Sequence, residues 1–244
     1  MRAMILAAGL GTRLKPVTEK IPKALVTINN QTLLELIIKK LAASGFDKII
    51  VNIHHFADQI SEYLKEKNNF NIDLTISDER EELLDTGGGL KKASWFFDDG
   101  KPFLLHNVDV LSNIDLKNLY QFHLKGNSIA TLAVQKRKSS RYFLFDKDDR
   151  LCGWKNDRTG EIKYSGKHTS NLNQSAFSGI QVIDPKIFKL MPERKIFSLV
   201  DLYLQISSKQ RITGFNHVKE EWIDVGKPEN LTIAETLLKK INKV

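Results

Sequence analysis

The chain has 244 residues, of which 41% are hydrophobic, 27% charged and 9% aromatic. This composition supplies enough apolar material for a core and excludes the disordered and fibrous classes. Lys and Arg outnumber Asp and Glu by 37 to 29, and this net charge of +8 favours anionic partners: phosphorylated small molecules, nucleic acid or acidic lipid.

The first two thirds of the sequence predicts an α/β protein, because short apolar runs alternate with amphipathic stretches. Residues 3–7 are expected to form a buried strand, and Thr32 with Glu35 forms a capping box that starts a helix ending at Gly45. Continuous apolar runs favour a mostly parallel sheet covered on both faces. Further strands are expected at 48–53, 72–77, 103–107 and 129–134, and further helices at 57–67, 89–97 and 115–125.

The sequence changes character from about residue 140, where short aromatic-rich runs are separated by polar turns at 146–149 and 157–160. This pattern is typical of antiparallel hairpins. After Pro228 an amphipathic pattern predicts a C-terminal helix.

Membrane and disulfide chemistry are not expected. No apolar run approaches the roughly 18 residues of a membrane span, and the apolar run at 4–8 is too short for a signal peptide. The single cysteine, Cys152, excludes an internal disulfide. We therefore expect a cytoplasmic protein without a membrane partner.

A glycine-containing loop follows the first predicted strand. Gly9 and Gly11 allow the backbone to approach a polyphosphate closely, and Arg13 and Lys15 place cations in the loop, with Lys23 shortly after it. The loop does not match the dinucleotide-binding fingerprint or the P-loop. A purely structural turn is the alternative interpretation.

Two aspartates stand where strands end, Asp109 and Asp224. Ligands of open α/β sheets bind at the carboxyl ends of strands, so carboxylates there are placed to hold Mg²⁺. The alternatives are that Asp109 caps a turn before Asn113 and that Asp224 precedes a Gly-Pro turn.

Two further glycine motifs occur at 85–90 and 177–180. The first motif can bring backbone against a flat ligand or a phosphate, or serve as a hinge. The second begins a predicted strand and can be a β-bulge.

Together these motifs resemble the sugar-1-phosphate nucleotidyltransferase family. The signature Leu-x-x-Gly-x-Gly-Thr-Arg-Leu-x-Pro-x-Thr matches residues 6–18, and Pro-Lys-x-Leu matches residues 22–25. The segments at 107–109, 177–180 and 222–228 follow in the family's order. The resemblance implies a Rossmann-like three-layer α/β/α fold with a small antiparallel and helical sugar-binding portion.

The resemblance also implies a division of the single domain, 1–244, into parts. Residues 1–135 correspond to a nucleotide-binding part, 136–225 to a sugar-binding and metal part, and 226–244 to the C-terminal helix. The reaction implied joins a nucleoside triphosphate to a sugar 1-phosphate, releases pyrophosphate and uses Mg²⁺.

The family's functional residues transfer to matching positions in this sequence. The expected set comprises catalytic Arg13 and Lys23; nucleotide-binding Ala8, Gly9, Gly11, Thr12, Gly87 and Gly88; sugar-phosphate-binding Ser178 and Gly179; and the metal ligands Asp109 and Asp224.

Several alternatives remain open at this point. Within the family, the glycine run and short chain resemble N-acetylmuramate-1-phosphate uridylyltransferases of peptidoglycan recycling, which implies UTP and a role in the cell wall. Guanylyltransferases acting on mannose or heptose 1-phosphate are also similar. A non-catalytic sensor of sugar nucleotides is a further possibility, whereas no nucleic-acid partner is expected. A monomer or a homodimer fits the sequence.

Overall fold

The computed structural model describes residues 1–166 and 171–241. They form two compact units. The first contains residues 1–83, 105–116 and the segment from 220 to the C-terminus, and the second contains 84–104 and 117–219.

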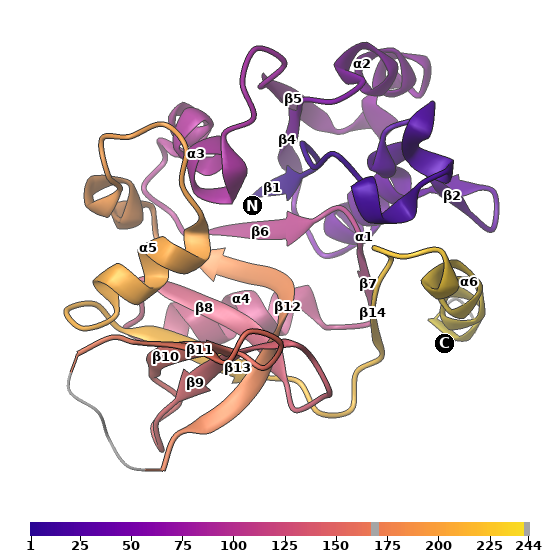
Figure 1. Cartoon of the computed structure of the whole chain (residues 1–244). Helices are drawn as coiled ribbons and strands as arrows, with labels where there is room; N and C mark the ends of the chain where they lie inside the picture. The colour runs from indigo at the N-terminus through magenta and orange to yellow at the C-terminus, as the bar shows by residue number, and fades with distance from the viewer. Residues whose placement is uncertain (167–170, 242–244) are drawn as a thin grey trace. The chain divides into compact units, whose positions relative to one another are not determined.

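The first unit is built on a parallel sheet of β1 (Arg2–Leu6), β4 (Lys48–Ile53) and β5 (Asp73–Asp78), seen in Figure 1. Ala3 pairs with Ile49, and Ile49 pairs with Leu74. Apart from their first residues, β1 and β4 carry no charge, and most of their side chains are buried. The parallel strands predicted from continuous apolar runs are therefore confirmed.

The first unit also contains helices, each of which has an apolar face that becomes buried when it packs against the rest of the unit. The helices of the first unit are α1 (Leu33–Ala43), α2 (Ala57–Glu66) and α6 (Glu229–Ile241). The predicted helix start is confirmed: Thr32 is the N-cap of α1, and its Oγ1 accepts a hydrogen bond of 3.0 Å from the Glu35 N–H. Residues 242–244, which the sequence places in the C-terminal helix, lie outside the described residues.

Short elements complete the first unit. They are η1 (Thr12–Leu14), η2 (Val17–Glu19), η3 (Lys23–Leu25), η4 (Asn68–Asn71), and the antiparallel pairs β2 (Thr27–Ile28) with β3 (Gln31–Thr32) and β7 (Val110–Ser112) with β14 (Trp222–Asp224). β6 (Phe103–Asn107) runs along the chain from the second unit into the first.

The second unit has a mixed sheet. β8 (Ala130–Gln135) pairs antiparallel with β12 (Asn173–Ile183) and parallel with β13 (Ile212–Asn216). β9 (Arg141–Phe145), β10 (Leu151–Asn156) and β11 (Glu161–Tyr164) form the antiparallel hairpins expected after residue 140. The α/β class with a mostly parallel first part and an antiparallel second part is therefore confirmed.

The helical elements of the second unit are α3 (Asp85–Lys92), η5 (Ser94–Phe97), α4 (Leu116–Lys125), η6 (Pro185–Leu190) and α5 (Leu199–Ile206). One prediction needs correction, because the helix expected at 89–97 begins at Asp85 and ends at Lys92. Its glycines are buried, and packing of the backbone overrides their low helix propensity.

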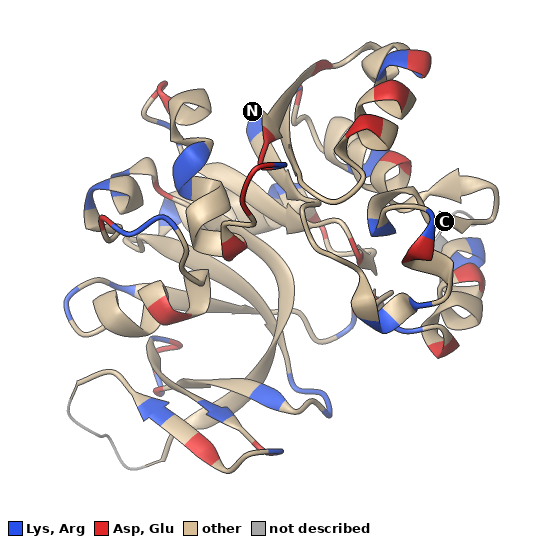
Figure 2. Cartoon of the chain, turned by 45° about the horizontal axis from the view of Figure 1, so that its top comes forward, with Lys and Arg blue, Asp and Glu red and all other residues tan. Residues whose placement is uncertain are grey.

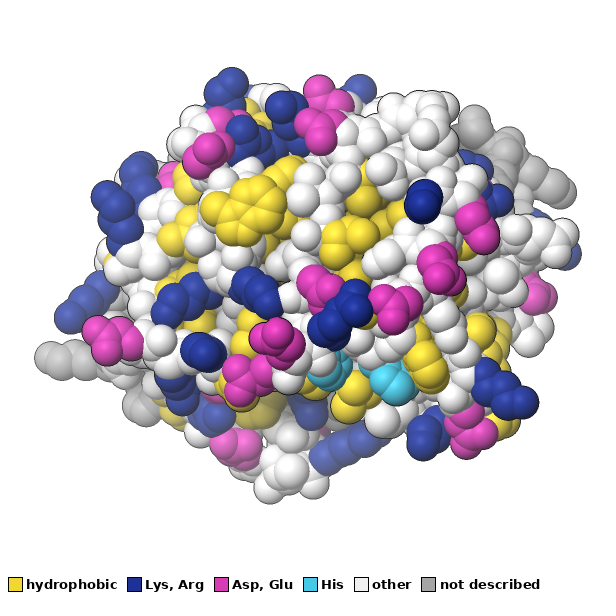
Figure 3. Space-filling model, turned by 90° about the horizontal axis from the view of Figure 1, so that it is seen from above, with side chains coloured by type: hydrophobic (Ala, Val, Ile, Leu, Met, Phe, Trp, Pro, Cys, Tyr) yellow, Lys and Arg dark blue, Asp and Glu magenta, His cyan; other side chains and the backbone are white. Residues whose placement is uncertain are grey.

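Charge lies mainly outside the central strands. β6, β8 and β12 have no charged residue, and Figure 2 draws such residues in tan. On the face in Figure 3, Lys and Arg side chains are interspersed with Asp and Glu. Across the described ranges, none of the helices has the length and apolar character required to cross a bilayer.

Candidate active site

The loop that follows β1 is anchored by a buried polar network. The Ala7 N–H donates to Asn52 Oδ1 at 2.7 Å, and Asn52 Nδ2 donates to Glu79 Oε1, also at 2.7 Å. His54 Nδ1 lies 2.8 Å from the Glu79 carbonyl oxygen. A buried amide with both ends bonded fixes the direction in which the loop leaves the sheet.

Within the loop, the backbone conformation favours glycine at position 11, whereas position 9 has no such requirement. Gly11 has φ +66°, and a Cβ there would lie 3.1 Å from Thr18 Cγ2 and 3.3 Å from Lys23 Cβ. Its carbonyl accepts a 2.8 Å hydrogen bond from Thr18 Oγ1. A Cβ at Gly9 would meet no protein atom within 4 Å. The surface above Gly9 is therefore open to a ligand.

The register of β7 against β14 brings the two aspartates together. Asp224 ends β14 and pairs with Val110, the residue after Asp109. The Val225 N–H donates to the Asp109 carbonyl at 2.8 Å. The turn that holds Asp109 also contacts the end of β1, since the Val108 N–H donates to the Leu6 carbonyl at 3.1 Å. Both aspartates and the glycine loop thus lie at one edge of the first unit's sheet.

Each aspartate faces a cation. Lys23 Nζ donates to Asp109 Oδ2, and both side chains are largely buried. Arg13 Nη2 lies 3.9 Å from Asp224 Oδ2, and the Arg13 side chain is 61% exposed. The first pair is positioned by burial, whereas the Arg13 guanidinium is free to turn toward an incoming anion.

The donor chemistry of this edge fits Mg²⁺. The ion is typically held in enzymes by one or two carboxylates together with substrate phosphates and water, and Asp109 and Asp224 supply two carboxylates at adjacent positions. Gly226 keeps the space beside them clear, because a Cβ there would lie 2.5 Å from Asp224 Oδ1 and 2.8 Å from Arg13 Nη2. The described residues contain no cluster of three or more His, Cys, Asp or Glu suited to a metal.

Gly87 and Gly88, in the second unit, have a packing role. Their N–H groups donate to the Phe197 carbonyl at 2.9 and 3.2 Å. A Cβ on Gly87 would lie 2.4 Å from the Phe197 ring, and one on Gly88 would lie 2.0 Å from the Lys195 carbonyl oxygen. Close approach of the 195–197 segment accounts for both glycines, and their contact with a nucleotide base stays a prediction.

Ser178 and Gly179 form a β-bulge in β12. The pairing with β8 shifts register between Phe177 and Gln181, and Gly179 has φ +73°. Ser178 is fully buried, and its Oγ lies 2.7 Å from His217 Nε2. The Ser178 hydroxyl therefore points into the unit's interior, and sugar-phosphate binding by this pair stays a prediction.

The structure thus brings together one part of the predicted set. Eight of these residues lie in the first unit: Ala8, Gly9, Gly11, Thr12, Arg13, Lys23, Asp109 and Asp224. Gly87, Gly88, Ser178 and Gly179 lie in the second. Sequence reasoning missed Asn52 and Glu79, which support the loop. Asn52 could have been noticed as a polar residue inside an otherwise apolar strand.

Comparison with known proteins identifies relatives along nearly the whole chain. The family model described as "Nucleotidyl transferase" matches residues 2–240. An N-acetylmuramate alpha-1-phosphate uridylyltransferase from Caulobacter vibrioides is 30% identical, with 97% of this chain and 96% of that protein covered. A UTP--glucose-1-phosphate uridylyltransferase from Synechocystis is 29% identical over 93% of this chain. A mannose-1-phosphate guanyltransferase from Yarrowia lipolytica is 28% identical over 94%. The chain spans about three fifths of the length of the latter two, 60% and 62% respectively.

Solved structures share the fold. HddC from Yersinia pseudotuberculosis, complexed with GMP-PN, superimposes with a TM-score of 0.78 at 24% identity, covering 97% of this chain and 99% of that one. The inositol-1-phosphate CTP transferase from T. maritima also gives 0.78, at 17% identity, covering 99% of this chain and 96% of that one. At these identities the likeness establishes the Rossmann-like fold. With a family match from residue 2 to residue 240 and this fold, the chain belongs to the nucleotidyl transferase family.

Proposed function

We propose that the protein transfers a nucleotidyl group from a nucleoside triphosphate to a sugar 1-phosphate and releases pyrophosphate. The observation that carries this proposal is the meeting of Asp109, Asp224, Lys23 and Arg13 beside an open glycine loop. The family match and the names of the relatives support the same reaction class.

The reaction does not require a strong general base. The attacking group is an oxygen of the sugar phosphate, which is already anionic, so catalysis consists of alignment and neutralisation of charge. Lys23 would bind the α-phosphate and the incoming phosphate together, and Arg13 would stabilise the negative charge that develops on the leaving pyrophosphate. The open surface at Gly9 would admit the triphosphate, which the N–H groups of Gly11 and Thr12 would contact.

Asp109 and Asp224 are the residues that would hold Mg²⁺. When bound, the ion supplies a template for the phosphates and charge neutralisation as a Lewis acid. Lys23 donates to Asp109 in this structure. Lys23 and the ion would therefore both contact that carboxylate, or the ion would displace Lys23 from one of its oxygens. No third protein ligand is required, because phosphate oxygens and water complete the coordination.

For substrates, we propose UTP with N-acetylmuramate 1-phosphate in the cytoplasm. Support comes from the Caulobacter relative, which this chain matches over 96% of that protein's length. GTP with mannose or heptose 1-phosphate is the alternative, given the guanyltransferase relatives. The glycine run adds little to the choice, because the N–H groups of Gly87 and Gly88 are already bonded to Phe197.

The test is a matrix of UTP and GTP against N-acetylmuramate, glucose, mannose and heptose 1-phosphates at one Mg²⁺ concentration, with pyrophosphate release measured as kcat/KM. The Asp109→Asn variant provides the blank for contaminating activity. Release in any combination that the variant lacks supports the reaction class. Absence of release throughout would contradict it, and a preference of about tenfold or more for GTP would overturn only the uridylyl assignment.

A further inference from the structure

A cavity of about 360 Å³ lies in the first unit, away from the glycine loop. Its volume is in the range of small-molecule sites. The wall is mostly apolar and comes from α1, from the segment 111–114 and from α6. The apolar lining residues are Leu36, Ile37, Leu111, Ile114 and Leu238.

Two lysines line this cavity, and one of them, Lys39, forms an ion pair with Glu35 at 2.7 Å. Lys40, in the last turn of α1, donates from Nζ to the Ser112 carbonyl oxygen and lies 3.1 Å from Ser112 Oγ. Both partners are neutral. Among the described residues no carboxylate forms an ion pair with Lys40, and Asp115 acts on it only over a longer range. The Lys40 side chain is half-buried and forms part of the cavity wall.

The partners of Nζ suit an uncharged amine as well as an ammonium. The Ser112 carbonyl accepts an N–H from either form, and the Ser112 hydroxyl, which accepts from the ammonium, can donate to the lone pair of the neutral amine. Loss of the proton therefore leaves no polar atom without a partner. A carboxylate in place of Ser112 would instead have bound the ammonium form.

The electrostatic environment favours the neutral amine. Burial lowers the pKa of Lys40 to about 8, and the negative charge of Asp115 opposes this only in part. The other titratable group that acts here, His106, is fully buried, and its pKa is lowered to about 3 by burial and by the charge of Lys40. The neutral form of Lys40 is therefore more populated near neutral pH than that of an ordinary lysine.

We propose that Lys40 forms the reactive end of a binding site for small apolar aldehydes, which it binds as a reversible imine. Nζ forms a bond to the carbonyl carbon, the aldehyde oxygen leaves as water with the two protons of the neutral amine, and a C=N bond results. The step needs no oxidant or reductant. The apolar tail of the aldehyde packs against Leu111 and Leu238.

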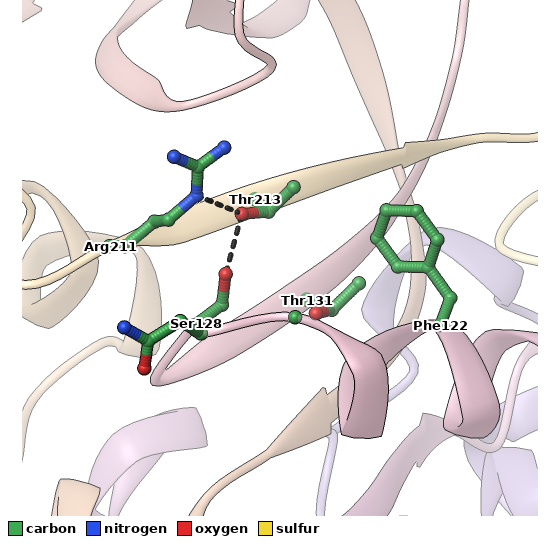
Figure 4. A pocket seen from close by; sticks show the side chains of 7 residues that line it. Phe122, Ser128, Thr131, Arg211 and Thr213 are labelled. Carbon is green, nitrogen blue, oxygen red and sulfur yellow. Dashed lines mark hydrogen bonds between the residues drawn. The ribbon is translucent and has the colours of Figure 1, made fainter.

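A cavity of similar size in the second unit lacks this chemistry. It has a volume of about 350 Å³, and Figure 4 shows three of its polar side chains, Arg211, Thr213 and Ser128, joined by hydrogen bonds. Arg211 Nε donates to Thr213 Oγ1 at 3.2 Å, and Thr213 Oγ1 lies 2.6 Å from Ser128 Oγ. It offers no amine, so the aldehyde chemistry belongs to the Lys40 cavity.

The experiment compares three lysines in the wild-type chain. The protein is incubated with butanal and cyanoborohydride, which reduces an imine to a stable amine, and the butyl groups on Lys40, Lys39 and Lys48 are quantified by peptide mass spectrometry. Lys39, whose Nζ is paired with Glu35 Oε1 at 2.7 Å, is the control within the same cavity. Lys48, which is 52% exposed and lies 3.6 Å from Asp73 Oδ2, is the control outside it. We expect Lys40 to be labelled at least about tenfold faster at pH 7.4, with a half-maximal rate near pH 8.

Two variants test the cavity itself. Leu238→Trp fills the space and should slow labelling of Lys40 at least about fivefold while leaving Lys48, outside the cavity, unchanged. Lys40→Arg should abolish labelling at position 40 alone, with circular dichroism confirming that both variants fold. Equal labelling of Lys39 and Lys40 in the wild-type chain would overturn the proposal, even if the variants fail to fold. A folded Leu238→Trp variant labelled at the wild-type rate would overturn the role of the cavity.

Discussion

At the scale of single residues, the two aspartates of the candidate active site differ in their place in the backbone and in exposure: Asp109 lies in the turn before β7, and Asp224 ends β14. Asp109 is 19% exposed at its side chain and bonded to Lys23, whereas Asp224 is 36% exposed and lies near Arg13. Asp109 is therefore the more strongly positioned of the two, and Asp224 has more room to accept an ion.

Replacement of either aspartate by its isosteric amide tests the metal assignment. Asp109→Asn and Asp224→Asn should each lower kcat at least about 100-fold, because an amide lacks the charge that holds Mg²⁺. Steady-state assays over a range of Mg²⁺ concentrations measure the effect. The matched control is Asp73→Asn, an exposed aspartate paired with Lys48. A variant with near-normal turnover at saturating Mg²⁺ would remove that aspartate from the metal site.

Arg13 should act on the transition state rather than on substrate binding. Its guanidinium is exposed and lies 3.9 Å from Asp224. Arg13→Ala should therefore lower kcat, with a loss of about 3 kcal/mol in transition-state stabilisation, and should change KM less. Arg13→Lys should recover only part of the loss, since an ammonium lacks the bidentate fork. Arg80→Ala, at an exposed guanidinium elsewhere in the unit, is the control. If Arg13→Ala raised KM alone, Arg13 would be a ground-state anchor.

The two loop glycines should respond differently to alanine. Gly11→Ala should destabilise the fold by about 1–3 kcal/mol, because its left-handed backbone and its contacts with Thr18 and Lys23 disfavour a side chain. Gly9→Ala should change stability by less than about 0.5 kcal/mol but weaken nucleotide binding about tenfold or more. Urea unfolding and equilibrium titration with nucleotide measure the two effects. Unchanged nucleotide affinity in Gly9→Ala would place the triphosphate elsewhere.

At the scale of elements, the side-chain amide of Asn52 holds the segments that leave the ends of neighbouring strands, which strand pairing alone does not fix. Asn52 connects the end of β1 to the residue after β5, through Ala7 and Glu79. The three strands are thereby fixed in the direction in which their loops leave the sheet, which sets the position of the glycine loop.

Removal of this connection should destabilise the unit. Asn52→Leu leaves the Ala7 N–H and Glu79 Oε1 without their Asn52 bonds, each at a penalty of about 1–3 kcal/mol, so we expect a loss of about 2–5 kcal/mol in the free energy of unfolding. Urea unfolding provides the measurement. Gln59→Leu, which removes a hydrogen bond to the Lys20 carbonyl, should change it by less than about 0.5 kcal/mol. Similar values for both variants would show that the network does not stabilise the unit.

At the scale of the whole molecule, stability should depend on pH through buried histidines. Burial lowers the pKa of His123 to about 4, with Asp184 opposing the shift, and its Nδ1 lies 2.9 Å from Thr131 Oγ1. Since the folded state resists protonation, the unfolded chain binds more protons below about pH 6.5. The stabilisation is therefore complete above that pH and is lost as the pH falls toward 4.

Between pH 7 and pH 5 the free energy of unfolding should fall by about 2 kcal/mol on account of His123. His123→Gln should remove that part of the pH dependence. Urea titrations at several pH values measure this. Parallel curves for His123→Gln and the wild type would show that His123 protonates equally in both states.

Much of the fold could be predicted because local patterns of apolar residues indicate which segments are buried. Strands such as β4 and β6 are mostly apolar, and the bounds that the sequence predicts for them match the observed ones. The helix at α3 was misplaced, because its glycines are weak helix formers on their own and are stabilised in the helix by the approach of Phe197.

The sequence by itself determined the α/β class, the glycine loop and the strand-end positions of Asp109 and Asp224, since all three depend on short-range patterns of burial and turn formation. Only the tertiary structure decided that β14 pairs with β7, which sets Asp224 beside Asp109 although they lie far apart in the chain. It alone revealed the amine of Lys40 in a cavity formed by α1, β7 and α6. These contacts depend on packing between segments that lie far apart in the chain, so no local pattern of residues encodes them.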